Sequence, residues 1–229
     1  MPTGRDRTRP EAARATTGPR VSVVPVGKAA HEVPAPRGPV RSATAAGFYD
    51  LVLVGGVPGA GKTTAIALAT DDLAHIGAID PEHISWWLRR RLPARVPYRA
   101  YRWIVHLGHT LRVLLHLLNG PVAGRRLVIH DPGTRAGRRR LFLGLAHLAG
   151  WRTVLLYVDV DRPAAQAGQV RRGRIVRSFD EHWQSWQRLR PALTAAPGQL
   201  VPAGAAGEPV ILTDRAHAAN VLRRLCLAA

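Results

Sequence analysis

The sequence predicts an α/β fold in which one parallel sheet is covered by helices on both faces. Short aliphatic runs alternate with longer helical stretches from Phe48 to the end of the chain. The first aliphatic run leads into a glycine-rich loop, and this loop opens a helix. Strands that alternate with helices form parallel β-α-β units with right-handed crossovers. The length of 229 residues suits one such domain with an appended segment.

Five segments have the aliphatic, β-branched character of strands. The first, FYDLVLV, begins at Phe48 and reads as a strand that is buried on both faces. The other four are expected at residues 76–80, 125–131, 153–160 and 209–213.

Helices are expected between these strands. The segment from Tyr98 to Asn119 is stopped by Gly120-Pro121, and a second helical region precedes it. The remaining helices are expected at residues 62 to about 76, 135–149, 162–173, 178–193 and from about 214 onward.

Residues 1–47 differ in composition from the rest of the chain. They are rich in Pro, Arg, Ala, Gly and Thr, and their eight basic residues against three acidic ones give a net charge of +5. Such a segment cannot bury enough apolar surface to offset the entropy of ordering it. We therefore expect a disordered basic tail at residues 1–47 and one folded domain at residues 48–229.

The formal net charge of +18 rests almost entirely on arginine, because only Lys28 and Lys62 are lysines. A basic surface is compatible with nucleic acid, but a solvated arginine-rich surface is the favoured interpretation. The single cysteine, Cys226, excludes an internal disulfide, and no apolar run is long enough to span a membrane. These features lead us to expect a cytoplasmic protein without a membrane partner, and they leave its oligomeric state open.

The stretch VGGVPGAGKTT carries the clearest functional signal. It satisfies the phosphate-binding pattern G-x-x-x-x-G-K-[ST] between a hydrophobic strand and a helix. Backbone N–H groups at such a helix start point at phosphate oxygens, where the helix dipole also favours negative charge. The predicted phosphate-binding residues are Gly56, Val57, Pro58, Gly59, Ala60, Gly61, Lys62, Thr63 and Thr64.

Two residues of this stretch have distinct predicted roles. Lys62 would reach the β- and γ-phosphates of a nucleotide, and the Thr63 hydroxyl would bind Mg²⁺. The alternative is a glycine-rich turn without a ligand.

Three acidic residues follow predicted strands. Asp80 and Glu82 come after the second strand, and Asp131 ends the third. Ligands of open α/β sheets bind beyond the carboxyl ends of strands, so all three side chains could face the γ-phosphate. Asp131 is predicted to hold Mg²⁺ with Thr63, and Asp80 or Glu82 to accept the proton of an attacking hydroxyl. Capping of a helix or turn is the competing interpretation for Asp131, and capping of a helix is that for Asp80.

Together, VGGVPGAGKTT, IDPEHI, HDPGTR and AGQVRRGRIV resemble the small P-loop kinases related to zeta toxins, gluconate and shikimate kinases and polynucleotide 5′-hydroxyl kinases. These kinases belong to the P-loop NTPase superfamily that includes AAA proteins. The resemblance implies a three-layer fold with a five-stranded sheet in the order 2-3-1-4-5. Ser85 stands where the family pattern often has an arginine, so the resemblance does not identify the acceptor.

The resemblance also implies a basic lid at about residues 165–177. In the related kinases such a lid closes on the triphosphate, and Arg171, Arg172 and Arg174 beside Gly173 match this role. A solvated basic helix end is the alternative. Arg135, shortly after Asp131, is a further candidate for contact with the acceptor or the γ-phosphate.

Aromatic side chains gather in the segment that small kinases use for the acceptor. They would either stack on a planar acceptor or belong to the core. This set comprises Trp86, Trp87, Tyr98, Tyr101 and Trp103.

The sequence therefore predicts an ATP- and Mg²⁺-dependent phosphotransferase acting on a hydroxyl of a small or nucleotide-like acceptor. A polynucleotide 5′-hydroxyl kinase and a regulatory ATP-binding module with slow hydrolysis remain as alternatives. The chain lacks an Asn-Lys-x-Asp motif for guanine, which favours ATP.

Overall fold

A computed structural model of the chain describes residues 48–131, 133–173, 176–194 and 208–228. All of them belong to the second of two units into which the chain divides, Val40–Ala229. The predicted tail at residues 1–47 and the predicted lid residue Arg174 lie outside the described residues. None of the helices in the described ranges is both long and apolar enough to cross a membrane.

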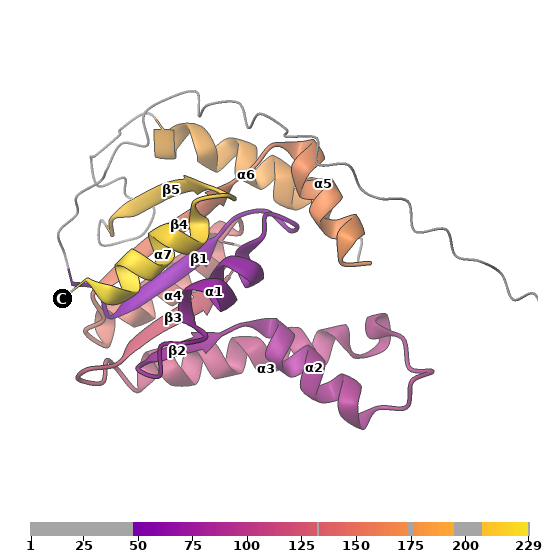
Figure 1. The fold of residues 1–229 in the computed structure, drawn as a ribbon, viewed down its shortest axis with the longest axis horizontal. Coiled ribbons are helices and arrows are strands. Elements are labelled where there is room, and N and C mark those ends of the chain that lie inside the picture. The colour runs from indigo at the N-terminus through magenta and orange to yellow at the C-terminus, as the bar shows by residue number, and fades with distance from the viewer. Residues whose placement is uncertain (1–47, 132, 174–175, 195–207, 229) are drawn as a thin grey trace, which may run out of the picture. The chain divides into compact units, whose positions relative to one another are not determined.

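Five parallel strands form one sheet in the order β2-β3-β1-β4-β5 (Figure 1). This order confirms the five-stranded α/β fold and the arrangement implied by the family resemblance. The strands are β1 (Leu51–Gly55), β2 (Ile76–Ile79), β3 (Arg126–His130), β4 (Thr153–Asp159) and β5 (Val210–Asp214). The central strands β1, β3 and β4 are buried along nearly their whole length, as their continuous aliphatic sequences predict.

Seven helices connect and cover the strands in the described part of the chain. They are α1 (Lys62–Thr70), α2 (Pro81–Arg91), α3 (Tyr98–Leu118), α4 (Ala136–Leu148), α5 (Arg162–Arg171), α6 (Phe179–Thr194) and α7 (Ala218–Leu227). Most bounds match the predictions within a few residues. Helix α1 is shorter than the predicted residues 62 to about 76, because the Thr70 hydroxyl bonds back to Ile66 O and the N–H of Leu73 turns back to Thr70 O.

Helices α1 and α7 pack together on one face of the sheet, and α4 covers the other face (Figure 1). Helix α3 packs against both α2 and α4. Trp186 of α6 is fully buried and its ring lies 5.4 Å from that of Tyr157 on β4. Trp186 therefore anchors α6 to the sheet.

The register brings the carboxyl ends of β1 and β3 side by side. Val54 of β1 pairs with His130 of β3, and Ile79 of β2 pairs with Ile129. The loops that leave β1, β2 and β3 therefore start at one edge of the sheet, where α/β proteins bind their ligands.

Candidate phosphate-transfer site

The loop between β1 and α1 requires glycine at several positions. Gly56, Gly59 and Gly61 have φ angles of +133°, +86° and +101°, which side chains with a Cβ rarely adopt. A Cβ on Gly59 would lie 2.0 Å from the carbonyl oxygen of Ala165 in α5. The loop is therefore held closely against α5 and keeps its backbone open at the start of α1.

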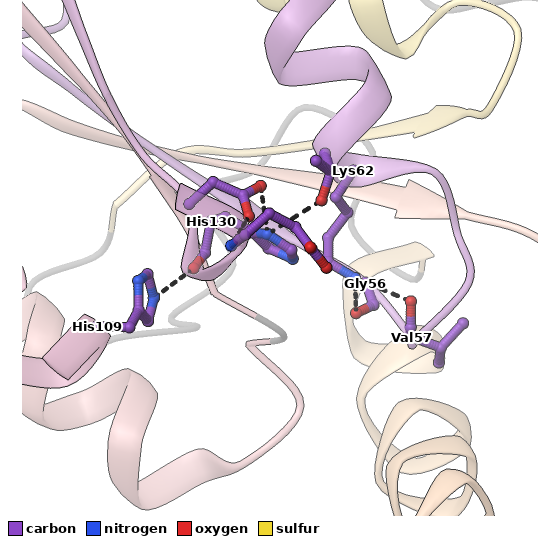
Figure 2. A network of polar contacts seen from close by, with 8 residues as sticks. Gly56, Val57, Lys62, His109 and His130 are labelled. Carbon is purple, nitrogen blue, oxygen red and sulfur yellow. Dashed lines mark hydrogen bonds and ion pairs between the residues drawn. The ribbon is translucent and has the colours of Figure 1, made fainter. Parts of the chain in front are cut away.

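Lys62 is the first residue of α1 and is buried beneath this loop. Its Nζ donates hydrogen bonds to Gly56 O at 2.8 Å and Val57 O at 2.9 Å (Figure 2). Burial and the positive charge of Arg172 lower the pKa of Lys62 to about 7, against the opposing effects of Asp80 and Asp131. An anion beside Nζ would favour its charged form.

Arg215, in the segment between β5 and α7, holds the same loop from the other side. Its Nη2 donates to Gly59 O at 2.6 Å and to Ala164 O at 3.0 Å, and its Nε donates to Ala60 O at 3.1 Å. Arg215 is not among the site residues predicted from the sequence. No local signal identifies it, because its partners in the loop are more than 150 positions away in a chain rich in arginine.

Asp80 caps α2 and also faces Thr63. Its Oδ1 accepts the N–H of Glu82 at 2.7 Å, and its Oδ2 lies 2.7 Å from Nδ1 of His130. The Thr63 hydroxyl lies 3.5 Å from the same nitrogen. The capping interpretation is thus correct for Asp80, and its second oxygen remains directed toward the start of α1.

The contacts of Asp80 keep its carboxylate ionised. Burial by itself raises the pKa of Asp80, but the hydrogen bond and charge of His130 and the N–H of Glu82 together hold the pKa well below its usual range. A carboxylate can only accept, so His130 Nδ1 carries the proton of the bond to Asp80. His130 in turn presents its backbone oxygen to Nε2 of His109, 2.9 Å away (Figure 2). Sequence reasoning did not single out His130.

The side chain of Glu82 has different neighbours from those of Asp80. Its side chain lines a groove of about 720 Å³ between α2 and α3, together with Trp86, Trp87 and Arg112. Its backbone N–H, by contrast, serves Asp80. Of the two predicted acceptor-side acids, Asp80 is the one that the structure brings to Thr63.

Asp131 follows β3 directly, but its carboxylate is engaged elsewhere. Oδ1 lies 2.8 Å from Nε of Arg138, and Oδ2 accepts the N–H of Gly133 at 3.0 Å. Its side chain lines a small cavity with Phe142 of α4 and Tyr157 of β4, on the sheet face opposite α1. The described contacts therefore give no support to the predicted pairing of Asp131 with Thr63.

The predicted lid arginines are only partly described. Arg171 ends α5 and Arg172 follows it, and both are exposed. The charge of Arg172 contributes to the lowered pKa of Lys62. The N–H of Val176 donates to the buried Gln169 side chain at 2.8 Å, so the backbone at Val176 lies against α5.

The aromatic set divides between core and surface. Tyr101 is buried and meets Tyr98 edge-on at 5.3 Å. Trp86, Trp87 and Trp103 are at least half exposed. Arg90 lies over the Trp86 ring at 3.8 Å, and Arg91 over the Trp87 ring at 4.0 Å.

The loop and its surroundings fit a nucleotide triphosphate with a magnesium ion. Helix α1 has no side-chain cap at Gly61, so the N–H groups of its first turn are left for an anion. In the described part of the chain, no three His, Cys, Asp or Glu side chains gather into a cation site. The Thr63 hydroxyl and the Asp80 carboxylate are oxygen donors of the kind that bind Mg²⁺ together with substrate phosphates.

Comparison with solved structures finds proteins of similar fold at low sequence identity. Kti12 of Chaetomium thermophilum, in complex with ADP-AlF3, is 16% identical with a TM-score of 0.48, over 76% of this chain and 96% of that chain. Shikimate kinase of Acinetobacter baumannii, in complex with shikimate, is 16% identical with a TM-score of 0.45, over 78% and 90%. A structure of the PezAT toxin-antitoxin system of Streptococcus pneumoniae is 14% identical with a TM-score of 0.46, over 76% of each chain.

No curated protein matches the chain at a significant level. A sequence family described as an AAA domain matches residues 51–195, which contain the phosphate loop, the Asp80 and His130 pair and helix α5. This match spans more than half of the chain and agrees with the resemblance to P-loop proteins. The chain belongs to this AAA-domain family.

Proposed function

We propose that this chain binds ATP with Mg²⁺ at the loop of residues 56–64 and transfers the γ-phosphoryl group to a hydroxyl of an acceptor. The observation that carries the proposal is the junction of β1, β2 and β3. There the buried Lys62 lies beneath a phosphate-binding loop, and the Asp80–His130 pair lies beside Thr63. Kinases of this type act mainly by positioning their substrates and stabilising charge. Lys62 and the Asp80–His130 pair are groups that can supply both effects.

The nucleotide side of the site consists of the loop amides and Lys62. Lys62 and the open N–H groups of α1 hold the phosphates, and Arg215 fixes the loop by binding its carbonyl oxygens. The exposed Arg171 and Arg172 extend from the end of α5 and add positive charge over the transferring group. Arg174 is proposed for the same role from the sequence alone.

The cation is assigned to Thr63 and Asp80 in place of Thr63 and Asp131. The Thr63 hydroxyl and Oδ2 of Asp80 both lie within 3.5 Å of Nδ1 of His130, so two candidate oxygen ligands lie close together. When bound, Mg²⁺ would neutralise part of the negative charge on the phosphates. His130 orients the Asp80 carboxylate, as outer partners commonly do for ligating carboxylates.

Asp80 is also the proposed contact for the acceptor hydroxyl. Because its pKa is held low, Asp80 acts by accepting a hydrogen bond and orienting the hydroxyl rather than by storing a proton. Glu82 is not needed for this role, since its side chain lines the groove between α2 and α3.

Transfer of labelled γ-phosphate from ATP tests this proposal. The chain is incubated with Mg²⁺ and a panel of sugars, nucleosides, nucleotide sugars and 5′-hydroxyl oligonucleotides, with Lys62→Ala as the control. We expect a labelled acceptor with the wild type and none with the variant. Tight ATP binding with no labelled acceptor would favour the regulatory ATP-binding module.

A further inference from the structure

Helix α3 is largely apolar on two sides. One side packs against α2, α4 and the edge strand β2 (Figure 1). A helix on the surface of a globular protein normally turns polar side chains to its other side. On α3 the other side carries aliphatic side chains instead. The residues buried on the packed side are Tyr101, Val105, His109, Val113 and Leu117.

Five aliphatic side chains form an exposed row along the second side of α3. Steps of three or four residues keep side chains on one face of a helix, so the row is continuous. At 1.5 Å per residue it is about 21 Å long. An exposed apolar surface of this kind marks a contact with another molecule. The members of this row, which we call the α3 row, are Ile104 (37% exposed), Leu107 (60%), Leu111 (54%), Leu115 (53%) and Leu118 (62%).

The spacing of the α3 row is symmetric about Leu111. The steps between its members are three, four, four and three residues, so the row reads the same from either end. Two copies of α3 related by a two-fold axis perpendicular to them run antiparallel and present the same surface to each other. With the axis at Leu111, Ile104 faces Leu118 and Leu107 faces Leu115. Leu111 meets its own copy, and the row is therefore complementary to itself.

The charges near α3 are compatible with this antiparallel pair. Arg99 and Arg102 lie in the first two turns of α3, and the chain has no acidic residue from His83 to His130. In the pair these arginines lie beside the last turn of the partner helix, where the helix dipole places partial negative charge. Each Arg102 is about 27 Å from its copy along the axis. This separation exceeds the screening length of about 8 Å, so the arginines do not repel each other across the pair.

We infer that a second copy of this chain covers the α3 row, so that the protein forms a two-fold dimer through antiparallel α3 helices. The inference goes beyond the proposed kinase function and uses none of the residues proposed for it. Trp103, which is 64% exposed and precedes Ile104, lies opposite Asn119 of the second copy and extends the contact. Phosphates of a nucleic acid would leave the leucines without partners, and a lipid surface requires no symmetry in the row.

Sedimentation of the full chain in the absence of nucleotide tests the inference. We expect the wild type to be a dimer at micromolar concentration. Leu111→Asp places facing carboxylates at the axis, and it should raise the dimer Kd about a hundredfold or more because a buried, unpaired charge is costly. Leu68→Asp is the matched control, since Leu68 is 68% exposed on α1, and it should leave the Kd unchanged. Circular dichroism of both variants checks that they are folded.

Single introduced cysteines test the register of the pair. A short bismaleimide should link Leu111→Cys to its own copy, whereas the native Cys226 is buried and does not react. Ile104→Cys should link to Leu118→Cys when the two proteins are mixed. Neither should link to itself, because the two copies of each position are about 21 Å apart along the axis. Self-linking of Ile104→Cys as efficient as the mixed product would indicate parallel helices and overturn the inference.

Other occupants of the row give different results in the same variants. A monomeric wild type, or a dimer that Leu111→Asp leaves intact, would overturn the inference. Vesicles of equal parts phosphatidylcholine and phosphatidylglycerol, and a single-stranded oligonucleotide, are tested as alternative partners. Binding of either by a monomer, lost in Leu111→Asp and kept in Leu68→Asp, would assign the row to that partner instead. No nucleotide is present, so each of these results is separate from failure of the kinase assay.

Discussion

At the scale of single residues, the places of Asp80 and Asp131 in the sheet determine which side chains their carboxylates contact. Both acids directly follow strands of the sheet. Asp80 lies beside His130 and close to Thr63, whereas Asp131 pairs with Arg138 on the other face of the sheet. Successive side chains of a strand point to opposite faces of the sheet, so the side chains of His130 and Asp131 point in opposite directions. His130 consequently takes the place beside Thr63 that the sequence suggested for Asp131.

A buried histidine makes the stability of the chain depend on pH. His109 is 2% exposed, and burial, with the charges of His130 and Arg138, lowers its pKa to about 3. In the unfolded chain the value is the ordinary 6.5, so the unfolded state binds more protons between these limits. The contribution to stability is complete above pH 6.5 and is lost as the pH falls toward 3, by about 1.4 kcal/mol per pH unit.

Urea unfolding at pH 7 and pH 5 measures this contribution. The wild type should lose about 2 kcal/mol more on acidification than His109→Gln, in which the titrating ring is absent. The glutamine amide keeps a donor for His130 O, which makes the substitution a conservative one. Equal losses in the two proteins would show that His109 does not titrate in this range.

Arg215 provides a second test at the residue scale. Replacing it by methionine removes three hydrogen bonds to carbonyl oxygens of the loop and of α5, and the loop loses its fixed form. We expect the Kd for ATP to rise about tenfold, which corresponds to about 1.4 kcal/mol. Arg224→Met, at an exposed position of α7, is the control and should leave the Kd unchanged. Unaltered ATP binding in Arg215→Met would show that the loop keeps its form without this side chain.

At the scale of elements, the phosphate loop and α5 fit against each other through two glycines. A Cβ on Gly59 would lie 2.0 Å from Ala165 O, and one on Gly168 would lie 2.2 Å from Gly59 O. The loop can therefore approach the helix backbone only where both positions lack a side chain. This contact links the phosphate site to the helix that carries Arg171 and Arg172.

Alanine substitutions separate close contact from backbone strain. Gly59 and Gly150 have similar φ angles, +86° and +80°, but a Cβ on Gly150 would meet nothing within 4 Å. Gly150→Ala should cost only the left-handed backbone strain, about 1–2 kcal/mol. Gly59→Ala should cost clearly more and abolish ATP binding, as thermal unfolding and ATP titration would show. Equal destabilisation by the two substitutions would mean that the loop moves away from α5 at little cost.

The elements also show what the sequence could and could not predict. Strands β1, β3 and β4 are runs of aliphatic residues, and the phosphate loop is a contiguous motif, so local sequence identified both. The contacts of His130 with Asp80 and of Arg215 with Gly59 join positions 50 and 156 residues apart. Pairs of this kind depend on strand order and register, and no local pattern in the chain contains that information.

At the scale of the whole molecule, the order of the strands determines which loops lie beside the phosphate loop. In the order β2-β3-β1-β4-β5, the nucleotide loop leaves the central strand β1. Asp80 follows β2 and His130 ends β3 on one side of β1, and α5 follows β4 on the other. The residues proposed to bind the nucleotide and the residue proposed to contact the acceptor hydroxyl thus follow different strands of one sheet.

The central claim is that Lys62, Thr63 and Asp80 form one site for magnesium and phosphate. The most direct test is the Mg²⁺ dependence of γ-phosphoryl loss from ATP in the wild type, Asp80→Asn and Asp131→Asn. We expect Asp80→Asn to lower the rate about 100-fold or more and to require more Mg²⁺, because the substitution removes a charged oxygen beside Thr63. Asp131→Asn should keep the wild-type Mg²⁺ dependence and a rate within several-fold of it. The reverse pattern, with Asp131→Asn inactive and Asp80→Asn active, would contradict this site.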